Sequence, residues 1–120
     1  MAGGVVHLPL YATGFRGDDL QAALELIAPL STKYGATRYE VFRSRDDRYK
    51  FLLSVAFDDK RGWDAYWYGP EFTEFRTACS GWFQVPLLYV WNDLVTRGEV
   101  REPEPSPAGA KAGATAGEAD

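Results

Sequence analysis

The sequence has little of the chemistry from which most protein sites are built. Its 120 residues include one cysteine, one histidine and one methionine. The single cysteine, Cys79, excludes an intramolecular disulfide and is typical of a reducing compartment. Since His7 is the only imidazole, no zinc or haem ligand set can be assembled at the known spacings. We therefore expect no metal and no bound cofactor.

The chain also lacks a long hydrophobic run and an excess of positive charge. No stretch approaches the roughly 20 apolar residues of a membrane span, and the N-terminus lacks the basic region of a signal peptide. Thirteen basic and 17 acidic residues give a net charge of −4. Neither nucleic acid nor an anionic membrane is therefore expected as a partner. The expected compartment is the cytoplasm.

Large apolar side chains are missing from the last 20 positions. Residues 101–120 contain six Ala, three Gly and three Pro, but no Val, Ile, Leu, Met or aromatic residue. Such a segment has no large apolar side chains whose burial could offset the entropy cost of ordering it. We expect residues 1–100 to form one domain and residues 101–120 to be a disordered tail.

Aromatic residues are abundant in the remaining chain. All 18 of them (four Trp, seven Tyr and seven Phe) lie in the first 100 residues. A domain of this size buries only about 65% of the surface of its unfolded chain. Some of these rings should therefore line a partner surface or a ligand pocket, although packing is the simpler explanation at most positions.

The order of elements predicts an α+β fold. Alternating residues indicate strands at 5–12, 37–44, 49–57 and 87–94, and helical spacing indicates helices at 18–34, 60–68 and 70–78. Asp18 is expected to cap the first helix, and Pro29 to kink it. Pro9 is expected at a sheet edge or bulge. The resulting βαββααβ order is a ferredoxin-like arrangement with an antiparallel sheet.

Four segments of the sequence resemble a known family. They occur in the order and spacing of the dimeric α/β-barrel superfamily and are most similar to antibiotic biosynthesis monooxygenase (ABM)-like domains: Gly35–Ser44, Lys50–Asp59, Trp63–Tyr66 and Gly69–Phe75. The resemblance implies a homodimer whose two sheets face each other. It also implies a small hydrophobic or aromatic ligand, bound between each sheet and its helices or inside the barrel.

The family hosts several chemistries, and its functional residues match this chain unevenly. Haem-degrading members carry Asn, Trp and His where this chain has Leu10, Tyr66 and Arg76, so haem degradation is not expected. Polyketide cyclases of the fold carry a strand His and a helix Tyr at the places of His7 and Tyr66. Their further catalytic His falls on Phe72, which removes the usual base.

These comparisons define a candidate site. We expect His7 and Tyr66 to be catalytic residues. Five further residues are expected to bind the substrate: Tyr11, Trp63, Trp67, Phe72 and Arg76. The leading hypothesis is a cofactor-independent monooxygenase-like protein that binds a small aromatic or polyketide-like anion. One alternative is a polyketide cyclase or isomerase that uses His7 and Tyr66. The other is a non-catalytic, small-ligand-binding or structural barrel.

Overall fold

The predicted order of elements is confirmed in the computed structural model, which describes residues 3–101. Helix α3 begins at Pro70, as expected of a residue that lacks an amide N–H and suits the first helical turn. Asp59 caps α2, because its Oδ1 accepts a hydrogen bond from the backbone N–H of Arg61 at 2.8 Å. The elements are β1 (Gly4–Tyr11), α1 (Gly17–Ile27), the 3₁₀ helix η1 (Ala28–Tyr34), β2 (Ala36–Arg43), β3 (Lys50–Phe57), α2 (Lys60–Trp67), α3 (Pro70–Ala78) and β4 (Val90–Asn92).

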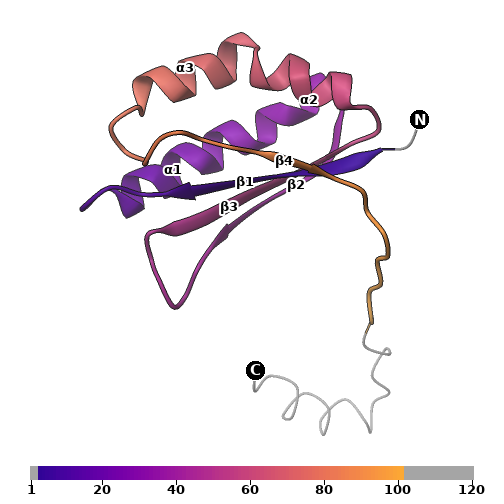
Figure 1. Ribbon diagram of the computed structural model, residues 1–120, viewed down its shortest axis with the longest axis horizontal. Coiled ribbons are helices and arrows are strands. Elements are labelled where there is room, and N and C mark those ends of the chain that lie inside the picture. The colour runs from indigo at the N-terminus through magenta and orange to yellow at the C-terminus, as the bar shows by residue number, and fades with distance from the viewer. Residues whose placement is uncertain (1–2, 102–120) are drawn as a thin grey trace, which may run out of the picture.

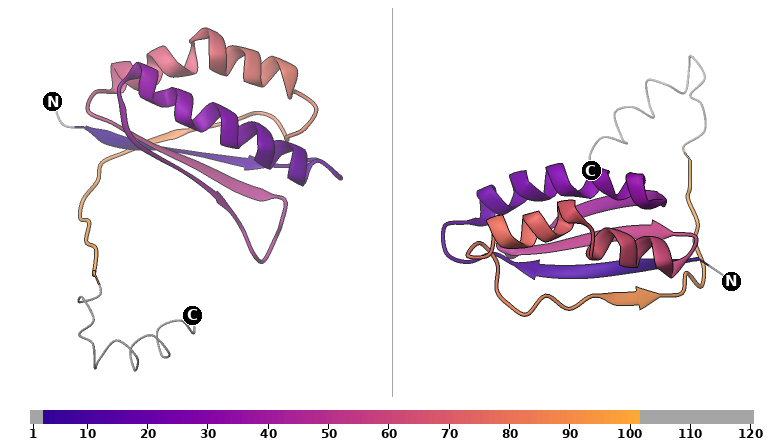
Figure 2. Two further views of the ribbon diagram at one scale, coloured as in Figure 1. Left: turned by 180° about the vertical axis from the view of Figure 1, so that it is seen from behind. Right: turned by 90° about the horizontal axis from the view of Figure 1, so that it is seen from above.

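The four strands form one antiparallel sheet in the order β2-β3-β1-β4. This is the ferredoxin-like order, in which β1 and β3 are central. Within residues 3–101, the three α-helices lie on one side of the sheet, and the other side carries no helix (Figure 1). We call that second side the open face. The same arrangement is seen from behind and from above in Figure 2.

Strand alternation decides which side chains reach the core. Val6, Leu8 and Leu10 of β1 are buried on the helix side, so their neighbours His7 and Pro9 lie on the open face. The core continues across β3 through Leu53 and the other buried odd-numbered residues of that strand, and is closed by α1, α2 and α3. His7 and Tyr11, four positions apart, therefore share the same face of this strand.

Two local predictions need correction. Asp18 does not cap α1, because the capping position is Arg16 and no side chain accepts a hydrogen bond there. The Asp18 carboxylate instead accepts a hydrogen bond from Arg43 at 2.8 Å, which joins α1 to β2. The predicted strand 87–94 is only three residues long, Val90–Asn92. The preceding segment leaves the sheet because Tyr89 turns onto the rings of α2.

Pro9 is tolerated because β1 is a central strand along only part of its length. Strand β4 pairs with Val5, Val6 and His7 and goes no further. Pro9 lies between this pairing and the hydrogen bond that the backbone N–H of Gln84 donates to the carbonyl oxygen of Tyr11. Among the described residues no strand pairs with β1 at Pro9 on that side, so its missing amide N–H costs no ladder hydrogen bond. The predicted tail lies outside the described residues except for Arg101.

Candidate functional site

Five of the rings pack together on the helix side of the sheet, and we call them the aromatic cluster. Residues 63, 66 and 67 share one face of α2 because they are three and four positions apart. The centroid of the Trp63 ring lies 5.7 Å from that of Tyr66, 5.4 Å from that of Trp67 and 6.2 Å from that of Phe72 on α3. The members are Trp63, Tyr66, Trp67, Phe72 and Tyr89.

Tyr89 closes this cluster from outside the helices. Its ring lies 5.0 Å from Trp63 and 5.2 Å from Trp67, edge to face in both cases. It is the one member carried by the irregular segment between α3 and β4. The sequence did not indicate this role, because Tyr89 fits the alternation of a strand equally well.

The Tyr66 hydroxyl is already engaged. It is fully buried and donates a 2.6 Å hydrogen bond to the carbonyl oxygen of Ile27, at the end of α1. Burial, with a smaller contribution from the negative charge of Glu71, raises the pKa of Tyr66 well above its usual value. Tyr66 therefore stays neutral at physiological pH and anchors α2 to α1, and it is a poor general base.

Unlike the Tyr66 hydroxyl, the indole N–H of Trp63 is not hydrogen-bonded within the described residues. Trp63 is fully buried, and its Nε1 has no hydrogen-bond partner among the described residues. A buried donor without an acceptor costs about 1–3 kcal/mol, so such groups usually mark a bound water, a bound ion or a functional site. This donor points to an acceptor that the protein itself does not supply.

Positive charge lies against the same rings. The Arg76 guanidinium carbon is 4.1 Å from the centroid of Trp67 and 5.2 Å from that of Phe72. Its Nη1 also donates a 2.9 Å hydrogen bond to the carbonyl oxygen of Trp67. Desolvation lowers the pKa of Arg76 from its usual value, but guanidinium remains charged in proteins. The cluster thus has a cation on one of its sides.

A hydrogen-bond network around Glu71 links the helices next to these rings. The Glu71 carboxylate on α3 accepts hydrogen bonds from Lys33 and from the hydroxyl of Tyr34. The Tyr34 ring in turn lies 5.8 Å from Tyr66. These contacts tie η1 to α3 beside the aromatic cluster.

The other two predicted site residues lie elsewhere. His7 is half-buried on the open face, where its Nδ1 is 3.1 Å from Nδ2 of Asn92. Because an amide nitrogen can only donate, this contact is a hydrogen bond when Nδ1 is the unprotonated ring nitrogen. Tyr11 donates a 2.7 Å hydrogen bond to Asp47. The sheet separates both residues from the aromatic cluster, so His7 and Tyr66 are not brought together.

The open face is largely apolar along its middle. Antiparallel pairing places Pro9 opposite Leu52, and Leu52 opposite Phe42. Phe42 is 51% exposed, and Val90 of β4 is 54% exposed. Large exposed apolar side chains gathered on one sheet face are typical of an interaction surface.

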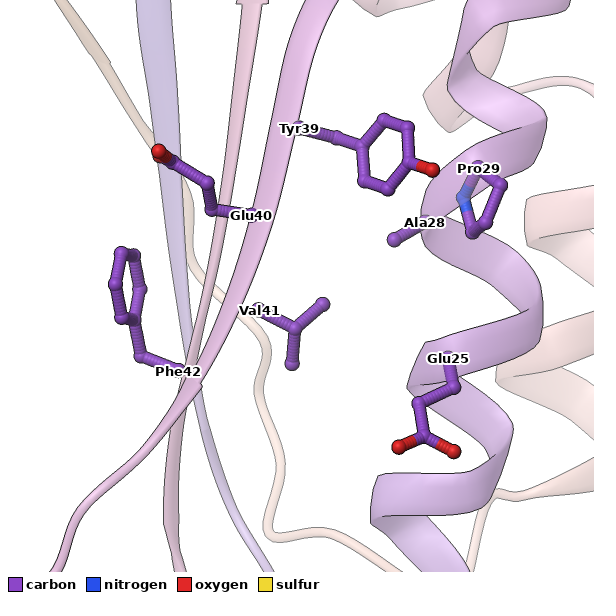
Figure 3. Close-up of a pocket in the computed structure, with 7 residues that line it drawn as sticks. All are labelled: Glu25, Ala28, Pro29, Tyr39, Glu40, Val41 and Phe42. Atoms are coloured by element: carbon purple, nitrogen blue, oxygen red, sulfur yellow. The ribbon is translucent and has the colours of Figure 1, made fainter.

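A groove at the edge of the sheet lies away from both sets of residues. It has a volume of about 440 Å³ and runs between β2 and the α1–η1 helices. In Figure 3, Tyr39 and Val41 point from β2 toward Ala28 and Pro29, whereas Phe42 points the other way. No predicted site residue lines this groove, which we call the edge groove.

Within residues 3–101, no three His, Cys, Asp or Glu side chains gather in a way that could hold a metal ion. The same part of the chain has no helix with the length and apolar character needed to cross a bilayer.

Comparisons with known proteins support the fold. No family model and no curated protein matches the chain. A Nitrosomonas europaea protein named as a candidate antibiotic biosynthesis monooxygenase has a TM-score of 0.70 at 18% identity, over 80% of this chain and 94% of that one. A Bordetella bronchiseptica protein of the same name has a TM-score of 0.70 at 16% identity, over 80% and 100%.

A third similar structure, PA3566 from Pseudomonas aeruginosa, has a TM-score of 0.71 at 13% identity, over 80% of this chain and 97% of that one. Identities this low are evidence of a shared architecture and carry no residue roles. The chain therefore has the ferredoxin-like α+β fold of the proteins named antibiotic biosynthesis monooxygenases, and the resemblance seen in its residues is confirmed at the level of fold.

Proposed function

We propose that this chain is a homodimeric, cofactor-independent monooxygenase-like protein that binds a small aromatic, polyketide-like molecule at the aromatic cluster. The observation that carries the proposal is the buried Trp63 N–H without an acceptor. An anionic phenol or enol oxygen is the acceptor that would satisfy it best, because charge-assisted hydrogen bonds are the strong ones.

The rest of the cluster suits the same ligand. Trp67 and Phe72 offer flat apolar walls to a planar molecule, and the Arg76 cation against them offsets a negative charge. Tyr66 keeps α2 in place through its bond to Ile27. The ligand enters by displacement of Tyr89, since that ring is held by an irregular segment and not by a helix.

The reaction requires a ligand that reduces oxygen itself. The bound anion gives one electron to O₂, the radical pair recombines to a peroxide, and loss of water leaves a carbonyl. A ring CH₂ and O₂ thus become C=O and H₂O, with one oxygen atom in each product. The protein contributes binding of the anion, a preorganised donor and exclusion of bulk water.

The homodimer is part of the proposal. The uncovered apolar surface around Leu52 and Phe42 supports burial of the open face against a second copy. We also propose a cytoplasmic location, because Cys79 is a single, buried thiol whose pKa is raised by burial and which gains nothing from an oxidising compartment.

The geometry of the site supports one of the two alternative functions and not the other. A cyclase that uses His7 and Tyr66 on one ligand is not supported, because the sheet lies between these residues. A non-catalytic binding or structural barrel remains the second candidate. It is favoured by the complete burial of Trp63, Tyr66 and Phe72, which is what ordinary core packing also produces.

Oxygen uptake with an anthrone-type phenol tests the proposal. The full chain is expected to consume one O₂ for each carbonyl formed. Trp63→Phe keeps a ring but removes the donor, and should lower the rate by about tenfold to a hundredfold, as expected for a hydrogen bond to a charged group. The matched control is Trp82→Phe, at a half-buried tryptophan outside the cluster.

Each other outcome selects a different function. A ligand that raises the melting temperature without oxygen uptake points to the non-catalytic barrel. Product that forms in the absence of oxygen points to cyclisation. Equal oxygen uptake by the wild type and Trp63→Phe would contradict the role given to the indole N–H.

A further inference from the structure

One half-buried cation lies against the aromatic cluster without a carboxylate beside it. Four Lys and Arg side chains within residues 3–101 are half-buried: Arg38, Arg43, Lys60 and Arg76. The first three form ion pairs with a carboxylate, at 3.6, 2.8 and 3.0 Å respectively. Arg76 has no carboxylate oxygen within 4.0 Å among the described residues. Because a charge that is withdrawn from water is normally paired, Arg76 points to an anion that comes from outside the chain.

Most of the hydrogen-bonding capacity of Arg76 is unused. A guanidinium carries five N–H donors, and among the described contacts of Arg76 only Nη1 donates, to the carbonyl oxygen of Trp67 at 2.9 Å. This bond and the stacking on the Trp67 ring hold the guanidinium in place. A guanidinium that is held in place and keeps free donors is suited to a carboxylate, which it can bind through two parallel hydrogen bonds.

Arg76 and the Trp63 N–H lie at different depths of the aromatic cluster. Trp63 is fully buried, whereas Trp67 and Arg76 are half-buried. The Trp67 ring contacts both, since its centroid lies 5.4 Å from that of Trp63 and 4.1 Å from the guanidinium carbon. A ligand with one acidic oxygen at Trp63 and a second acidic group at Arg76 would supply an acceptor to the buried donor and an anion to the rim.

The charges around the cluster favour a singly charged group at the rim. The other cation beside these rings is Lys60, whose ammonium lies 5.7 Å from the centroid of Tyr89. Its charge is offset by Asp64, at 3.0 Å. One uncompensated positive charge, that of Arg76, therefore faces the ligand. It matches a carboxylate better than a doubly charged phosphate, which would need a second cation.

We propose that Arg76 binds a carboxylate group of the substrate, so that the molecule taken by the aromatic cluster is an aromatic carboxylic acid. This inference rests on the proposed function, because it specifies the substrate class of that site. The phenol or enol oxygen of the substrate lies at the Trp63 N–H, and its carboxylate lies at the guanidinium of Arg76. Arg76 thus determines which aromatic molecules are accepted.

Binding of a matched pair of probes tests this assignment. One probe is an anthrone-type phenol that carries a ring carboxylate, and the other is the methyl ester of the same molecule. Isothermal titration calorimetry under nitrogen, where no oxygen is consumed, measures both dissociation constants with the full chain. The acid should bind at least about tenfold more tightly than the ester, as expected of charge-assisted hydrogen bonds to a guanidinium.

Arg76→Gln should remove this preference. The glutamine amide keeps a donor for the Trp67 carbonyl oxygen but loses the charge. The dissociation constant of the acid should therefore rise at least about tenfold, and that of the ester less than about threefold. The matched control is Arg61→Gln, which removes an 89% exposed cation from α2 and should leave the ratio of the two constants unchanged. The comparison of acid and ester on the wild type needs no variant, and it decides the question even if Arg76→Gln fails to fold.

The outcomes separate this inference from the proposed function. Equal binding of acid and ester by the wild type would overturn the role of Arg76 and leave the proposed function standing. A preference for the acid that persists in Arg76→Gln would also overturn it, because the carboxylate would then be bound elsewhere. So would an equal loss of affinity for both probes, because Arg76 would then only position Trp67. A wild type that binds neither probe would overturn the proposed function as well.

Discussion

Glu71 shows how one carboxylate couples stability to pH. The Lys33 ammonium, followed by the Tyr34 hydroxyl, lowers the pKa of Glu71 to about 2 from an ordinary value of 4.5. Because this pKa is depressed in the folded state, the Glu71 carboxylate contributes fully to the free energy of unfolding above pH 4.5. This contribution is lost as the pH falls from 4.5 toward 2. Glu71→Gln should lower the free energy of unfolding at pH 7 and flatten its pH dependence in that window.

Urea denaturation at several pH values measures this effect. The control is Glu74→Gln, which removes an exposed carboxylate from the same helix and should leave the pH dependence unchanged. Identical pH profiles for the wild type and Glu71→Gln would show that the link between η1 and α3 contributes nothing to stability.

Residue-scale reasoning from the sequence identified the rings but not how they divide between the two sides of the sheet. Helical spacing alone puts Trp63, Tyr66 and Trp67 on one face of α2, and their rings do pack together. The side of the sheet occupied by His7 depended on strand register, and a shift of one residue reverses every side chain. Only the pairing of β1 with β3 and its packing under the helices decide that Leu8 faces the core and His7 does not.

At the scale of elements, Gly35 determines how η1 turns into β2. Its φ is +99°, in the left-handed region, and a Cβ at this position would meet nothing within 4 Å. The cost of Gly35→Ala is therefore purely conformational, about 1 kcal/mol. Gly14→Ala is the control, since Gly14 has equal space without a positive φ. Equal midpoints of urea unfolding for the two variants would contradict this explanation.

Local signals marked several element boundaries, although Asp18 does not cap α1. Helix α3 begins at Pro70 as predicted, Asp59 caps α2, and Gly35 separates η1 from β2. Prediction failed for residues 87–94 because alternation alone does not show which residues find a partner strand. The packing of Tyr89 on Trp63 and Trp67 competes with the ladder, and β4 keeps only Val90–Asn92.

At the scale of the whole molecule, the fold leaves one face of its sheet to be covered. Leu52 lies near the middle of that face, between Pro9 and Phe42. Leu52→Arg should place two charges in the proposed interface and convert the dimer to a monomer, as measured by light scattering. Tyr68→Arg, at a 73% exposed side chain next to α2, should leave the dimer intact. A wild-type monomer at micromolar concentration would contradict the proposed assembly.

In the proposed function, the buried Trp63 N–H is the recognition donor for an aromatic oxyanion. Selective ¹⁵N labelling of the four tryptophan indoles tests this role, with Trp63→Phe identifying the relevant NMR signal. Addition of an anthrone-type phenol should move the Trp63 indole proton downfield, as expected when a free donor gains a charged acceptor. A Trp63 signal that stays in place while other tryptophan signals shift would contradict the account.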